Sequence, residues 1–115
     1  MVVIKTFEEI LAWQKAKVLV VDIYSYFRNS NDYGFKAQIQ RASISIMNNI
    51  AEGYERRSNN EFRNFLYIAK GSCGEVRSML EIAFELNYIT KGQYDKSYSE
   101  SLEISRMLSG LIKTL

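Results

Sequence analysis

Hydrophobic residues recur along this chain every three or four positions, the spacing that keeps side chains on one face of an α-helix. The clearest run predicts a helix at 59–87. Its apolar seam, with alternating steps of four and three residues, is Phe62, Leu66, Ala69, Cys73, Val76, Leu80 and Ala83. Similar spacings predict helices at 7–28, 35–56 and 91–113, and no segment shows the sustained alternation of a β-strand.

Start signals support these four helices. Thr6, Ser58 and Thr90 each precede a Glu or Gln by three residues, which is the pattern of a capping box. The remaining helix follows a polar turn at 29–34. Because short connections make consecutive helices antiparallel neighbours, we expect an all-α protein, an antiparallel up-down-up-down four-helix bundle, with a single domain over 1–115.

The first two helices carry more apolar residues than one bundle core needs. In the segment 7–28, Leu11, Val18 and Val21 lie off the main apolar stripe, and the segment 35–56 has a similar surplus. A second buried surface would explain this surplus, so we expect a homo-oligomer. The alternative is a monomer that exposes scattered apolar residues, as small bundles often do.

Composition argues against an enzyme. The chain has no histidine, which removes the commonest general base and the commonest transition-metal ligand. Its glutamates invite comparison with di-iron carboxylate bundles, but that chemistry uses Glu-x-x-His pairs. Cys73 falls on the apolar seam and should be an inert, buried thiol. We therefore expect no catalytic residue, no metal and no cofactor.

The ends and the apolar runs of the chain indicate a cytoplasmic protein. No run approaches the 18 apolar residues of a membrane span, and the N-terminal segment lacks the apolar core of a signal peptide. The net charge is only +2, but the cations are concentrated in the middle of the chain, where residues 36–77 carry seven basic and four acidic side chains.

Several of these cations share one side of the 59–87 helix or lie near its start. Basic groups interleaved with aromatic rings can hold phosphates and stack bases. The candidate nucleic-acid-binding residues are Arg56, Arg57, Arg63, Tyr67, Lys70 and Arg77. The alternative is a solvated face in which Arg77 pairs with Glu81 one turn later.

Three features predict details of packing. Glu75 falls on a second apolar seam, so it should have a charged partner such as Arg41. Gly71 and Gly74 lower helix propensity, and close packing of another helix would explain their presence. Asn49 and its polar neighbours form either a network that fixes helix register or a site, and register is the preferred interpretation.

Two segments, QIQRASISIMNNIAEG at 38–53 and EFRNFLYIAKGSCGE at 61–75, resemble the four-helix-bundle family named for proteins encoded in intervening sequences of 23S ribosomal RNA genes. The resemblance extends to 7–16 and to Tyr33-Gly34, so it covers nearly the whole chain. It implies a compact four-helix protomer and a ring-like homopentamer. A related branch comprises the accessory proteins of diversity-generating retroelements, which implies a reverse transcriptase and nucleic acid as partners.

Residues and resemblance together predict a non-enzymatic oligomeric scaffold, with a pentamer favoured. Its basic surface is expected to bind RNA, DNA or a nucleic-acid enzyme. The alternative is a structural, self-assembling protein that binds a protein partner through an apolar, Tyr-rich surface. Salt dependence separates the two, because phosphate contacts give a steep salt slope and apolar contacts do not.

Overall fold

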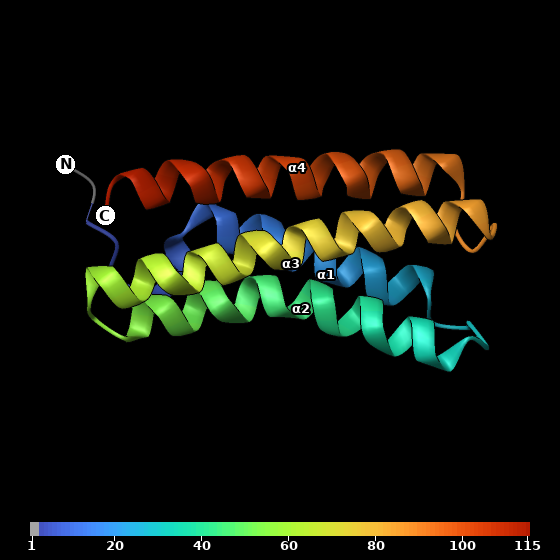
Figure 1. Ribbon diagram of the computed structural model, residues 1–115, viewed down its shortest axis with the longest axis horizontal. Helices are drawn as coiled ribbons and strands as arrows, with labels where there is room; N and C mark the ends of the chain where they lie inside the picture. Colours follow the sequence, from blue (N-terminus) through green and yellow to red (C-terminus); the bar gives the residue numbers. More distant parts are fainter. Residues whose placement is uncertain (1–2) are drawn as a thin grey trace.

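The structure is a computed structural model that describes residues 3–115. Its elements are a short 3₁₀-helix η1 (Phe7–Glu9) and the helices α1 (Leu11–Tyr26), α2 (Tyr33–Glu55), α3 (Asn59–Glu85) and α4 (Lys91–Lys113). The described residues contain no strand, and none of their helices is long and apolar enough to cross a membrane. The helices form a bundle of 45 × 22 × 19 Å (Figure 1). The predicted all-α four-helix bundle is confirmed.

The four helices occupy the corners of a square in chain order. Helix α1 packs against α2 and α4, and α3 also packs against α2 and α4. Helices α1 and α3 therefore lie on diagonally opposite corners, and α3 passes in front of α1 in Figure 1. Because each helix reverses direction relative to the one before it, α1 and α3 run parallel to each other.

The three capping signals begin helices, but two of them act differently from the prediction. At Thr90 both halves of the capping box form with Gln93. At Ser58 the hydroxyl accepts the Glu61 amide at 3.3 Å, but the Glu61 carboxylate turns to Arg56. The signal at Thr6 caps only η1. An extended backbone at Ile10 separates η1 from α1, so the single helix predicted over 7–28 is wrong.

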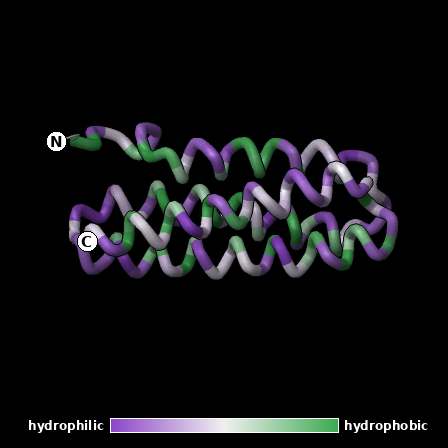
Figure 2. The backbone as a smooth tube through the Cα atoms, turned by 90° about the horizontal axis from the view of Figure 1, so that it is seen from above, coloured by the Kyte–Doolittle hydropathy of each residue, from purple (hydrophilic) through white to green (hydrophobic). Residues whose placement is uncertain are grey.

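The core follows the predicted seam of α3, since all seven of its residues are buried. The apolar surplus is distributed differently from the prediction. In α2, Met47 packs against the core. In α1, Leu11, Val18 and Val21 remain exposed, and Figure 2 shows hydrophobic residues on successive turns of this first helix. A further exposed apolar set lies on α3 and directly after its end: Ile68, Ile82 and the C-cap residue Leu86.

Close helix packing occurs at Gly53, where α2 and α3 approach each other near their connecting turn. A Cβ atom at Gly53 would lie 2.6 Å from the Cβ of Phe65 and 3.4 Å from the Phe62 carbonyl oxygen. At Gly71 an added Cβ would meet nothing within 4 Å, and at Gly74 only a guanidinium nitrogen of Arg77 at 3.8 Å. The prediction that Gly71 and Gly74 mark close packing is therefore wrong within the protomer.

Candidate nucleic-acid interface

One side of α3 carries a stripe of three cations. Arg63, Lys70 and Arg77 are seven residues apart, so each is rotated only about 20° from the last around the helix axis. Arg77 donates to the Ser101 hydroxyl of α4 at 3.1 Å, which places this stripe on the side of α3 next to α4. Tyr67 is exposed beside the stripe. The structure thus brings together four of the six predicted residues.

Helix α4 adds two cations that sequence reasoning missed. Arg106 and Lys113 are also seven residues apart, and both are exposed. Because α4 runs antiparallel to α3 and Ser101 donates to the Cys73 carbonyl at 3.0 Å, Arg106 lies near the level of Lys70. The sequence feature that could have identified Arg106 and Lys113 is their seven-residue spacing, which matches the spacing of the cations on α3. We call the five cations the α3–α4 basic face: Arg63, Lys70, Arg77, Arg106 and Lys113.

Charges of opposite sign are segregated on α4. In residues 3–115, no carboxylate lies within 4.0 Å of a cation of the α3–α4 basic face. Two glutamates of α4 instead turn toward α1: Glu103 pairs with Lys15 at 3.5 Å, and Glu100 pairs with Lys96 at 3.1 Å. Lys96 also pairs with Asp22 of α1. The α1 side of α4 therefore holds neutralised pairs, and the basic face keeps its charge.

Arg56 and Arg57 lie off this face. Arg56 pairs with Glu52 at 3.1 Å and with Glu61 at 3.5 Å, and its guanidinium lies 5.1 Å from the centre of the Phe65 ring. These contacts connect the end of α2 to the start of α3, and the charge of Arg56 is neutralised by the two glutamates.

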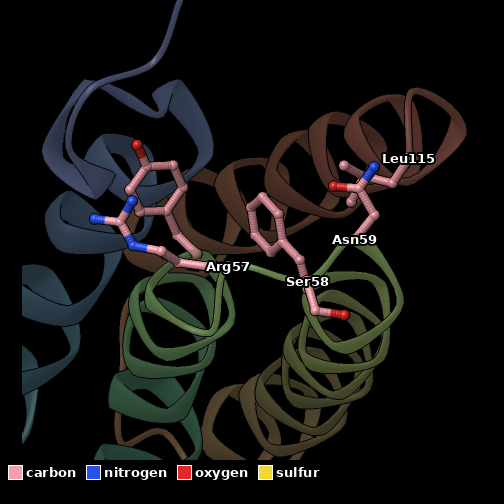
Figure 3. A pocket seen from close by; sticks show the side chains of 6 residues that line it. Arg57, Ser58, Asn59 and Leu115 are labelled. Atoms are coloured by element: carbon pink, nitrogen blue, oxygen red, sulfur yellow. The ribbon is translucent and has the colours of Figure 1, made fainter.

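Arg57 stands in the turn itself with a left-handed backbone, φ 58°. It lines a hollow of about 300 Å³ at the end of the bundle, in which Asn59 and Leu115 stand on the side opposite Arg57 (Figure 3). Its charge is therefore presented at the bundle end, away from the α3–α4 basic face.

Arg77 is bound to α4 and not to Glu81, the partner that the solvated-face alternative gave it. Its guanidinium donates to the backbone carbonyl oxygen of the buried Ser101 at 3.4 Å and to the Ser101 hydroxyl at 3.1 Å. The Glu81 carboxylate accepts a hydrogen bond from Tyr94, and this bond raises the pKa of Tyr94 to about 12. The Arg77–Glu81 pair of the alternative interpretation does not form, and Arg77 joins α3 to α4 as well as carrying charge.

The thiol of Cys73, the one cysteine of the chain, is buried behind this face. Cys73 is fully buried, and burial raises its pKa to about 11 although Arg77 and Lys70 favour the thiolate. The buried Ser43 hydroxyl of α2 also bonds within the protein, since it donates to the Gln40 carbonyl at 2.9 Å. Both the Cys73 thiol and the Ser43 hydroxyl are therefore enclosed within the protomer.

The polar residues of α2 form a register-fixing network with α3. The Asn49 amide donates to the carbonyl of Ser45 at 2.8 Å and to its hydroxyl at 2.9 Å, and the Ser45 and Ser72 hydroxyls lie 2.9 Å apart. Glu75 does not join this network. Its side chain is exposed and lines a hollow of about 170 Å³ together with Arg41. No cation of residues 3–115 lies within 4.0 Å of the Glu75 carboxylate. The predicted Glu75 pair is wrong.

Comparison with known proteins assigns the chain to a family. Residues 8–110 match the 23S rRNA-intervening sequence protein family. The chain belongs to this family. Among solved structures, this family member is similar to a protein with unknown function from the S23 ribosomal protein family of Bacteroides thetaiotaomicron. The two share 30% identity and a TM-score of 0.82, over 89% of this chain and 98% of the other.

No curated protein matches this 23S rRNA-intervening sequence protein. The resemblance found in the sequence is confirmed by the family match and by the structural similarity. Neither comparison describes an activity, so the role of the α3–α4 basic face depends on its own geometry.

Proposed function

We propose that this 23S rRNA-intervening sequence protein is a non-enzymatic, homo-oligomeric scaffold that binds nucleic acid through the α3–α4 basic face. The observation that carries the proposal is the collection of five cations on two adjacent helices with no carboxylate of residues 3–115 within 4.0 Å. A row of unpaired cations follows a phosphate backbone and gains affinity by releasing counterions. Exposed Tyr67 beside the row supplies a ring for base stacking.

Self-association would raise the affinity of this surface for nucleic acid. One protomer offers few phosphate contacts, but copies of the basic face that touch the same strand add up through effective concentration. The pentamer implied by the family resemblance is the assembly we favour. Cytoplasmic location and a nucleic-acid enzyme as an additional partner remain predictions.

The direct test replaces Arg63, Lys70 and Arg106 by Gln. These three are chosen because Arg77 also contacts Ser101, so its loss would disturb the α3–α4 packing. A matched control replaces three exposed cations outside the face: Lys5, Arg28 and Arg41 by Gln. Both variants lose the same charge, so a difference between them reports position and not net charge.

We expect the face variant to bind single-stranded RNA at least about tenfold more weakly than the control in fluorescence anisotropy. Its salt slope should fall by about 2, because each lost phosphate contact on a single strand removes about 0.7 from the slope. Equal binding by the two variants, or no binding by the wild type at low salt, would discard the basic face as a nucleic-acid site.

A second candidate function is a self-assembling protein that binds a protein partner through tyrosines. It is favoured by the exposed tyrosines of this chain: Tyr24, Tyr33, Tyr67 and Tyr88. Tyrosine is enriched at protein interfaces because its ring packs while its hydroxyl stays hydrated. Binding that is insensitive to salt and to the loss of the basic face would favour this function.

A further inference from the structure

A small polar hollow of about 170 Å³ lies where α2 packs against α3. We call it the α2–α3 hollow, and its lining residues are Gln38, Arg41, Ala42, Ser45 and Glu75. Pockets for drug-sized ligands measure about 300–1,000 Å³, so this hollow can take one edge of a planar ring but not a whole nucleotide. Its functional groups include a guanidinium, an amide and a carboxylate.

The two charged side chains of the α2–α3 hollow keep free hydrogen-bonding capacity. No carboxylate of residues 3–115 lies within 4.0 Å of the Arg41 guanidinium, and no cation of that part of the chain lies as close to the Glu75 carboxylate. Both residues are exposed. Because Arg41 only donates and an ionised Glu75 only accepts, a ligand between them must offer acceptors to one and donors to the other.

Guanine is the nucleobase whose edges match this requirement. Its N7 and O6 atoms are neighbouring acceptors, and an arginine donates to both at once. Its N1–H and N2–H groups are neighbouring donors, so one carboxylate accepts from both. Adenine, cytosine and uracil each have only one donor group on the Watson–Crick edge, next to an acceptor that a carboxylate repels. The pair of Arg41 and Glu75 therefore favours guanine over the other three bases.

The α2–α3 hollow and the α3–α4 basic face lie at opposite edges of the exposed side of α3. In Figure 1, α3 lies between α2 and α4, and it packs against both. At 100° per residue, Glu75 lies about 140° around the helix axis from Lys70. The two edges are separated by roughly one helix diameter, about 10–12 Å with side chains. A nucleotide spans this width from its phosphate to the far edge of its base.

Two glycines leave the strip between these edges without side chains. Gly74 and Gly71 lie about 40° and 100° around the axis from Lys70. A Cβ at Gly71 would meet nothing within 4 Å, and a Cβ at Gly74 would meet only a guanidinium nitrogen of Arg77 at 3.8 Å. A planar base can therefore lie against the backbone of α3 here. Exposed Tyr67, one turn before Gly71, is placed to stack on a neighbouring base.

We propose that the α2–α3 hollow recognises an unpaired guanine of a single-stranded RNA whose phosphates lie along the α3–α4 basic face. Arg41 donates to N7 and O6 of this base, and Glu75 accepts from its N1–H and N2–H. The base must be unpaired because a Watson–Crick partner would occupy the two donors. This inference rests on the proposed nucleic-acid binding and adds a base preference to it, since phosphate contacts carry no sequence information.

The first test changes only the RNA. Fluorescence anisotropy compares single-stranded RNAs of about twelve nucleotides, a length within the usual range of site sizes, that are all uridine except at one central position. This position carries guanosine, adenosine or inosine. We expect the guanosine RNA to bind about fivefold or more tightly than the adenosine RNA, the effect of one bidentate base contact. Inosine lacks only the N2 amino group of guanosine and should lose most of this preference.

The second test changes the two charged residues of the α2–α3 hollow. Glu75→Gln replaces one acceptor oxygen by a donor, and Arg41→Lys keeps the charge but loses the planar fork. Each should reduce the preference for guanosine to below about twofold. Neither should weaken binding of the adenosine RNA, because no positive charge is lost. The matched control is Glu85→Gln, which removes an exposed carboxylate at the end of α3 and should keep the preference.

The outcomes separate guanine recognition from binding by the basic face. Equal binding of the three RNAs by the wild type, or a preference that survives Glu75→Gln or Arg41→Lys, would overturn guanine recognition and leave the basic face in place. A wild type that binds none of the three RNAs at low salt would overturn both proposals. The basic-face variant and its control are compared on guanine-free RNA, because that control lacks Arg41.

Discussion

A Cβ atom on Gly53 would lie 2.6 Å from the Cβ of Phe65, closer than such atoms approach in folded proteins. Both atoms are held by backbone, so α2 and α3 would have to separate. We expect Gly53→Ala to destabilise the protein by about 1–3 kcal/mol, the usual cost of overpacking. Urea unfolding followed by circular dichroism measures this change.

Gly110→Ala is the matched control for Gly53→Ala. Gly110 lies inside α4, and an added Cβ meets nothing within 4 Å. Alanine should therefore stabilise α4 by up to about 1 kcal/mol through helix propensity. Equal effects of the two substitutions would contradict the close approach of α2 and α3 at Gly53.

The hydrogen bond between Ser45 and Ser72 should appear as a coupling energy. Their hydroxyl oxygens lie 2.9 Å apart, and Asn49 also donates to the Ser45 hydroxyl. A double-mutant cycle with Ser45→Ala and Ser72→Ala should give a coupling of about 1 kcal/mol in urea unfolding. The distant pair Ser45→Ala and Ser97→Ala should be additive. Additive behaviour of the first pair would remove this bond as a link between α2 and α3.

Cys73 should resist alkylation while the bundle is folded. Burial raises its pKa to about 11, so about one thiol in a thousand is ionised at pH 8, and the sulfur is also enclosed. Mass spectrometry should show no iodoacetamide adduct in native buffer and complete labelling in denaturing urea. Rapid labelling of the native protein would show that α3 opens around Cys73.

Glu100 should lower the free energy of unfolding as the pH rises above the usual pKa of a glutamate side chain. Burial raises the pKa of this carboxyl above the usual value for glutamate, and its Oε2 has no hydrogen-bond partner among residues 3–115. The folded state then binds a proton more tightly than the unfolded state, so ionisation of Glu100 costs stability between the two pKa values and above.

Glu100→Gln removes this titration. Relative to wild type, the variant should therefore compare more favourably at pH 7 than at pH 4 in urea unfolding. The control is Glu103→Gln, which removes an exposed carboxylate of the same helix. A difference between wild type and Glu100→Gln that does not change with pH would contradict the raised pKa.

Sequence periodicity determined the helices because a bundle helix must repeat its apolar residues at the helical period, whatever it packs against. The buried seam of α3 from Phe62 to Ala83 and the start of α4 at Thr90 could therefore be predicted directly. The family signature is also a local pattern, and it was recognised before any contact was known. The break at Ile10 was missed, because the apolar spacing continues through it while the backbone does not.

Only the tertiary structure decided which charges are free and which glycine is crowded. Both depend on side chains from helices that are distant in the sequence. Arg56 looked like Arg63 in the sequence, but Glu52 and Glu61 neutralise it. Arg106 and Lys113 joined the candidate site only when α4 lay beside α3.

Gly71 looked like a packing glycine, yet the close approach within the protomer is at Gly53. A single helix specifies its own faces through a fixed geometry of 100° per residue. What each face meets within the protomer is specified by the other three helices.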